Sequence, residues 1–72
     1  MAKMLAVYSC SPRFNESMVR AVHKVYGTKG IKGVEVTPSL DTINVEYDNG
    51  RLDAAQVDQI MLNAGLPVSR KL

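Results

Sequence analysis

The residue of this 72-residue chain with the widest chemical repertoire is its single cysteine, Cys10. A thiolate binds soft metal ions such as Cu(I), and it is also the nucleophile of cysteine chemistry. Ser11 and Pro12 follow it, a pair typical of a helix start. The positive end of such a helix, together with Arg13, would lower the pKa of the thiol. Cys10 is therefore the candidate metal ligand, and the alternative is a small, half-buried residue at the end of a strand.

Histidine and methionine supply the other side chains that could bind a soft or borderline metal ion. A helix beginning beside Cys10 would carry His23 roughly 15 Å or more away from the thiol, at a rise of ~1.5 Å per residue. That separation exceeds hydrogen-bond reach, so we predict His23 to be a solvated helix residue. Met4, Met18 and Met61 each fall on an apolar stripe, which favours core filling over copper binding.

The carboxylates show no pair at a spacing that would suit acid–base catalysis. The loop around Arg13 has no glycine, so it also lacks the anion cradle that an acylphosphatase-like enzyme would need. We therefore predict that the chain is not an enzyme. The carboxylates in question are scattered over predicted turns and outward strand faces: Glu35, Asp41, Glu46, Asp48 and Asp53.

The first half of the chain predicts a strand followed by a helix. Residues 4–9 are β-rich and alternate between two faces. A helix is predicted over 12–26, because Ser11 can cap free amides and Pro12 suits the first helical position, with Asn15 as the alternative cap. Apolar residues at helical spacing give it one buried face: Phe14, Met18, Ala21, Val22 and Val25.

The middle of the chain predicts a loop and then a β-hairpin. The stretch 27–33 is rich in glycine and reads as a loop, with Ile31 tucked beneath the domain. Residues 34–37 alternate between apolar and polar types until Pro38, which cannot donate to a strand ladder. Residues 42–47 alternate in the same way, so the hairpin has one buried face. That face comprises Val34, Val36, Ile43, Val45 and Tyr47.

The last third predicts a second helix and a short strand. Asp53 and Gln56 have the spacing of a capping box, and Gly65 closes a helix over 53–64. Residues 66–69 form a last strand whose proline suits a sheet edge. The element order βαββαβ predicts an α+β ferredoxin-like sandwich, with two helices on one face of a four-stranded antiparallel sheet. Its core is predicted to include Val22, Ile43, Val45 and Ile60.

Composition narrows the class of protein. The chain is 46% hydrophobic with a formal net charge of +2, which is typical of a globular domain rather than a disordered tail or nucleic-acid arm. Its length predicts one domain over residues 1–72. One cysteine permits no internal disulfide, which favours a reducing compartment, and we predict a cytoplasmic protein. No apolar run is long enough for a signal sequence or a membrane span, so no membrane insertion is expected.

Three segments carry a resemblance to a known family. Residues 33–36, 43–48 and 64–68 read G-V-E-V, I-N-V-E-Y-D and A-G-L-P-V. They resemble the corresponding segments of the heavy-metal-associated domain, which occurs in copper chaperones, in the N-terminal modules of copper-transporting ATPases and in mercury-binding proteins. The resemblance covers nearly the whole chain. It implies the ferredoxin-like fold and a soft metal such as Cu(I) or Hg(II).

The family's metal motif is degenerate here. Members carry M-x-C-x-x-C, whose two thiolates bind the metal in near-linear geometry. Alignment of the first helix by its apolar face puts these two cysteine positions at Ser11 and Phe14, neither of which is a ligand. Cys10 lies one residue before the first position. A single thiol is a much weaker site than a chelating pair.

Two functions from different classes follow. In the first, the chain binds or carries a soft metal weakly through Cys10, with the Cys10 of a second copy or an exogenous thiol completing the coordination. In the second, it is a metal-free interaction or regulatory module that meets an acidic protein through Arg13, Arg20 and Lys24.

Other proteins with the same element order fit less well. The RNA-recognition motif stacks bases on aromatic residues of its central strands, but residues 41–47 offer one aromatic and two acids, so no nucleic acid is predicted. Regulatory domains that bind amino acids use a glycine-bearing turn after the first strand, and the turn here has no glycine.

Overall fold

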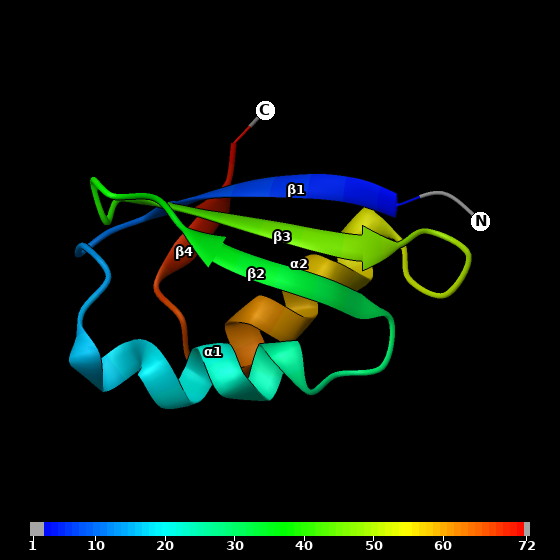
Figure 1. The fold of residues 1–72 in the computed structure, drawn as a ribbon, viewed down its shortest axis with the longest axis horizontal. Coiled ribbons are helices and arrows are strands. Elements are labelled where there is room, and N and C mark those ends of the chain that lie inside the picture. Colours follow the sequence, from blue (N-terminus) through cyan, green and yellow to red (C-terminus); the bar gives the residue numbers. More distant parts are fainter. Residues whose placement is uncertain (1–2, 72) are drawn as a thin grey trace.

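The computed structural model describes residues 3–71. Both helices cover the same face of a four-stranded sheet whose order is β2-β3-β1-β4, and every neighbouring pair of strands is antiparallel (Figure 1). The predicted ferredoxin-like sandwich is therefore confirmed. Its elements are β1 (Lys3–Cys10), a 3-10 turn η1 (Glu16–Met18), α1 (Val19–Tyr26), β2 (Ile31–Val36), β3 (Thr42–Asp48), α2 (Ala54–Asn63) and β4 (Val68–Arg70).

The two central strands supply most of the core. Ala6 lies opposite Val45, and Tyr8 lies opposite Ile43, in the register between β1 and β3. All four side chains are buried on the face that the helices cover. The alternation predicted for these strands is therefore confirmed, since a period of two places every second side chain on one face.

The first helix begins later than predicted. The chain from Ser11 onward is a loop whose amides bond elsewhere: Ser11 donates to the carbonyl of Pro67 at 3.1 Å, and Phe14 donates to that of Leu40 at 2.6 Å. The peptide bond between Ser11 and Pro12 is cis. Asn15 is the cap, because its side-chain oxygen accepts from the amide of Ser17 at 3.0 Å. The start at Ser11 and Pro12 is thus wrong, and the alternative cap is correct.

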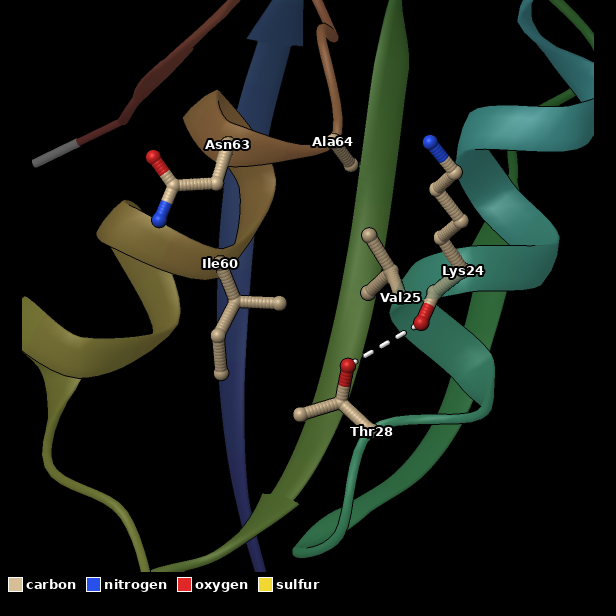
Figure 2. A pocket seen from close by; sticks show the side chains of 6 residues that line it. All are labelled: Lys24, Val25, Thr28, Ile60, Asn63 and Ala64. Atoms are coloured by element: carbon tan, nitrogen blue, oxygen red, sulfur yellow. Dashed lines mark hydrogen bonds between the residues drawn. The ribbon is translucent and has the colours of Figure 1, made fainter.

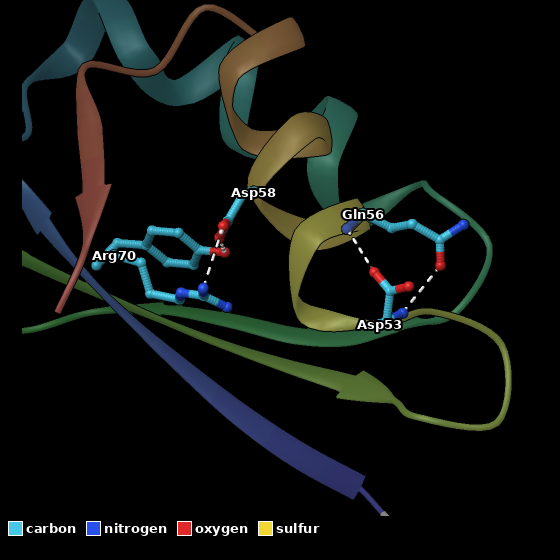
Figure 3. Close-up of polar contacts among 5 residues, drawn as sticks. Asp53, Gln56, Asp58 and Arg70 are labelled. Atoms are coloured by element: carbon cyan, nitrogen blue, oxygen red, sulfur yellow. Dashed lines mark hydrogen bonds and ion pairs between the residues drawn. The ribbon is translucent and has the colours of Figure 1, made fainter. Parts of the chain in front are cut away.

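The second helix has the predicted capping box (Figure 3). The amide of Gln56 donates to Asp53 Oδ1 at 2.8 Å, and the amide of Asp53 donates to Gln56 Oε1 at 2.9 Å. Two orphan amides at the helix start are satisfied in this way. The face turned to the sheet is centred on Val57 and Met61, whereas Ile60 is only partly buried.

The core prediction therefore needs correction at two positions. Ile43 and Val45 are fully buried, but Val22 and Ile60 lie at the margin of the core, packed against it. Both residues belong to the apolar stripe of their helix. The sheet covers only part of that stripe, so residues at its margin are only partly buried.

Strands β2 and β4 begin more than one residue from their predicted starts. β2 begins at Ile31, inside the stretch predicted as a loop, with a register shift between Ile31 and Gly33. Ile31 is buried as predicted. β4 covers Val68–Arg70 rather than 66–69, and it lies at a sheet edge as predicted.

Replacing Gly30 with alanine should destabilise the fold. Gly30 has a φ of 97°, and a Cβ built there would lie 2.9 Å from Cγ and Cδ1 of Leu52. We expect the variant to lose about 1–3 kcal/mol of unfolding free energy in a urea melt, the range for a strained backbone position. Gly33→Ala is the control, because its added Cβ would meet Glu46 at an ordinary 3.7 Å. Equal effects of the two changes would contradict this reading.

Candidate functional site

The candidate ligand Cys10 lies at the end of β1, beside Val68 of β4, with its side chain in the core. Only 3% of the residue is exposed. Its thiol donates to the carbonyl oxygen of Pro12 at 3.3 Å, and Sγ lies 4.0 Å from Sδ of Met18. The alternative interpretation is a small, half-buried residue at the end of the strand, and Cys10 does end β1 but is buried rather than half-buried.

Burial raises the pKa of the Cys10 thiol. The lowered pKa expected from the sequence is wrong, because the helical segment starts at Glu16 rather than beside the thiol. Cys10 is also buried, whereas Arg13 is exposed. In the folded protein the protonated thiol is the favoured form at neutral pH.

Alkylation kinetics can test this environment. We expect iodoacetamide to modify native Cys10 at least roughly tenfold more slowly than the same residue in urea at pH 8, since the thiolate is the reactive species and the thiol is both buried and protonated. Equal rates in the two states would show that the thiol is accessible. Because the folded pKa is raised, the stability that the protonated thiol contributes is complete below the unfolded pKa and is lost as pH rises through the folded pKa.

The structure separates the other sequence-predicted ligands. Met18 and Met61 are buried, as expected, but Met4 is 46% exposed and does not fill the core. His23 is an exposed residue of α1, as predicted. The fold does bring Cys10 Sγ within 4.0 Å of Sδ of Met18. Within residues 3–71, no group of three or more His, Cys, Asp or Glu side chains is arranged to hold a metal ion.

A polar network that was not predicted joins β1, α2 and β4. The hydroxyl of Tyr8 donates to Asp58 Oδ1 at 2.7 Å, and Asp58 Oδ2 lies 3.6 Å from Arg70 (Figure 3). Burial raises the pKa of Tyr8, and the hydrogen bond to Asp58 acts in the same direction. The hydroxyl of a buried tyrosine usually has a hydrogen-bond partner. This rule predicts that Tyr8 has a partner, but it does not identify Asp58.

Tyr8→Phe should therefore lower the unfolding free energy by about 1.5–3 kcal/mol, the range for a hydrogen bond to a charged group. The raised pKa means that this stabilisation is complete below the ordinary tyrosine pKa, and is lost as pH rises through the folded value. Urea melts between pH 7 and 11 would measure both effects. A variant whose stability falls with alkaline pH as steeply as that of the wild type would contradict the assignment to Tyr8.

Three cations stand on the outside of the first helical region, and we refer to Arg13, Arg20 and Lys24 as the basic face. All three side chains are exposed. The salt bridges found within residues 3–71 involve Lys3, Arg51 and Arg70 instead. The basic face therefore keeps its charges available to a binding partner.

A cavity of about 230 Å³ lies between the two helices (Figure 2). Val25, Ile60 and Ala64 contribute apolar surface to it, and Lys24 lies at its side. Thr28 Oγ1 donates to the carbonyl of Lys24 at 3.0 Å, which ties the end of α1 to the following turn. The cavity thus adjoins one end of the basic face.

No family model matches the sequence, and no curated protein matches it. Solved structures do match the fold. The oxidized MerP of Ralstonia metallidurans is 18% identical, with a TM-score of 0.78, over 99% of this chain and 100% of that chain. The chain has the fold of the heavy-metal-associated domains.

Two further solved structures share this fold. The yeast copper transporter domain Ccc2a, solved in apo and Cu(I)-loaded states, is 14% identical with a TM-score of 0.74, over 99% of this chain and 97% of that chain. Apo-CopP of Helicobacter pylori is 19% identical with a TM-score of 0.75, over 92% of this chain and 100% of that chain. Across residues 3–71, neither helix has the length and apolar character needed to cross a membrane.

Proposed function

We propose that the chain is a non-catalytic protein-interaction module with the heavy-metal-associated fold, and that it works without a metal. The observation that carries this proposal is the placement of Cys10 inside the core, where its protonated thiol donates to Pro12. A thiol in that position stabilises the fold and does not serve as a metal ligand. We propose one domain over residues 1–72 and a cytoplasmic location, because a reduced core thiol suits a reducing compartment.

The partner we propose is an acidic protein that meets the basic face. Arg20 and Lys24 project from one short helix, and Arg13 lies in the loop before it. Exposed charges of one sign steer association with a partner of the opposite sign. A structure of the Atx1-Cu(I)-Ccc2a complex also shares this fold, at 14% identity and a TM-score of 0.74. It supports the idea that domains of this shape meet other proteins.

A titration with a defined acidic probe tests the surface. We expect a poly-glutamate peptide to shift the amide NMR signals of α1, and we expect Arg20→Glu with Lys24→Glu to weaken binding at least roughly tenfold, since like charges repel across an interface. Lys71→Glu is the control, because Lys71 follows β4 and bonds to Thr42 Oγ1. If the double variant and the control lost affinity for the peptide equally, the binding would be non-specific charge attraction, and the proposed surface would be contradicted.

A second candidate rests on one contact. Cys10 Sγ and Met18 Sδ lie 4.0 Å apart, and a thiolate with a thioether is a donor pair that Cu(I) accepts. Such a site would need the thiol to lose its proton against the effect of burial. A metal-bridged dimer through the Cys10 of two copies would need the side chain to leave the core altogether. Because both requirements oppose the burial of Cys10, soft-metal binding is the second candidate function.

A further inference from the structure

One edge of the sheet is open. β2 is the outermost strand, and within residues 3–71 it pairs only with β3. The amide of Thr37 bonds to the carbonyl of Thr42, which fixes the alternation along the hairpin. Val34 and Val36 then fall at the non-hydrogen-bonded positions of the pair, so their N–H and C=O groups point away from β3. An additional strand could bond to these groups.

Apolar side chains lie beside that edge on the helix side of the sheet. Val19, Val22 and Tyr26 are spaced three and four residues apart, which places them on one flank of α1. Tyr26 is 59% exposed, and it lines a hollow together with Val34 of β2. Figure 1 shows α1 running along the sheet beside β2. Apolar side chains of an added strand would therefore find apolar contacts on this side.

Two carboxylates lie at the opposite side of the same edge, where the exposed Leu5 also lines the hollow. Lys32, which precedes Gly33 in β2, is exposed but does not line the hollow. The hollow, of about 360 Å³, opens at Gly33, whose missing side chain leaves space beside Glu46. Glu35 and Glu46 both line it, and no cation does. The nearest salt bridge joins Lys3 and Glu46 at 3.8 Å between two exposed side chains, which is a weak interaction. A basic side chain placed over Gly33 would therefore meet two carboxylates.

We propose that the β2 edge binds an extended, basic segment of another protein as a fifth strand. Every second residue of that segment is apolar and contacts Val34 and Tyr26, and a lysine or arginine between them lies over Gly33. Main-chain bonds to Val34 and Val36 supply affinity, and the two faces of the strand supply selectivity. This surface is separate from the basic face, so the proposal does not depend on the proposed function.

A second copy of the chain is a poorer occupant of the edge. Pairing of two β2 edges around Val34 would set Glu35 of one copy opposite Gly33 of the other. That glutamate would enter a hollow already lined by two carboxylates, and like charges that face each other across strands are destabilising. The charge of the hollow thus favours a basic heterologous strand over self-association.

Two synthetic peptides test the proposal, one alternating valine with lysine and the other alternating valine with glutamate. We expect the Val34 and Val36 amides to exchange rapidly in the free protein and the lysine peptide to slow that exchange. We expect no effect of the glutamate peptide. Glu35→Lys should raise the Kd for the lysine peptide at least roughly tenfold. Glu16→Lys, the same charge change at an exposed site before α1, should leave it within about twofold.

Three results would overturn the proposal. The lysine peptide could leave both amides unprotected, or the two peptides could bind equally well. In the third case, the Val34 and Val36 amides would be protected from exchange without any peptide, and this protection would increase with protein concentration. That outcome would make a second copy the occupant of the edge.

Discussion

Replacing Met61 with alanine is expected to lower the unfolding free energy by about 2–5 kcal/mol, the usual range for truncating a buried methionine. Met61 is 0% exposed and belongs to the core cluster beneath the sheet. Small domains have only about 5–15 kcal/mol of stability, so the loss would be a large share of the total. Urea denaturation followed by far-UV circular dichroism would measure it.

Ile60→Ala is the matched control for that experiment. Ile60 precedes Met61 in α2 but is only partly buried, at the cavity between the helices. The area it removes from water is smaller, so we expect a loss of roughly 1–2 kcal/mol. If Ile60→Ala proved the more destabilising of the two, α2 would be rotated relative to the orientation described above.

The second large effect concerns the lost chelate. Introducing Ser11→Cys together with Phe14→Cys should raise the affinity for Cu(I) by about 10²–10⁴-fold, because the second thiolate then binds intramolecularly at a high effective concentration. Soft thiolates are the ligands that select Cu(I). Competition against a Cu(I) chelator under anaerobic conditions would measure the change.

Each single variant serves as a control for the pair. Ser11 is exposed and Phe14 is partly buried, and both belong to the loop between β1 and η1. Neither Ser11→Cys nor Phe14→Cys alone should approach the double variant, since neither creates a C-x-x-C pair. A single variant that matched the double one would mean that another donor, such as Cys10, completes the site.

The elements with strong local signals could be predicted from the sequence. The hairpin followed from alternation in β2 and β3, and the start of α2 followed from the reciprocal bonds of Asp53 and Gln56. Both signals act within a few residues of the chain, so no knowledge of distant contacts was needed. The order of elements then left the ferredoxin-like arrangement as the natural prediction.

The start of the first helix depended on distant contacts. Ser11 and Pro12 form a favourable local start, but the amides of Ser11 and Phe14 bond to Pro67 and Leu40. Those partners lie on other loops, and they hold the segment as a non-helical connection. Tertiary hydrogen bonds thus outweighed a weak local preference.

The candidate site also depends on contacts between residues that are distant in the sequence. The sequence predicts a lowered pKa for the Cys10 thiol, but burial raises this pKa, and the burial comes from contacts such as that with Met18. The bond from Tyr8 to Asp58 joins residues of β1 and α2 that no local pattern relates. Sequence periodicity could place both Tyr8 and Cys10 on strand one, but it could not identify the side chains that they meet.

One measurement tests the central claim most directly: native mass spectrometry of the wild-type protein after anaerobic titration with Cu(I) in the presence of a competing chelator, with Cys10→Ala beside it. If Cys10 is a structural core residue of a metal-free module, neither protein should retain copper, and their spectra should match. A one-to-one copper adduct that forms on the wild type and disappears in Cys10→Ala would contradict the account and establish the thiol as a metal ligand.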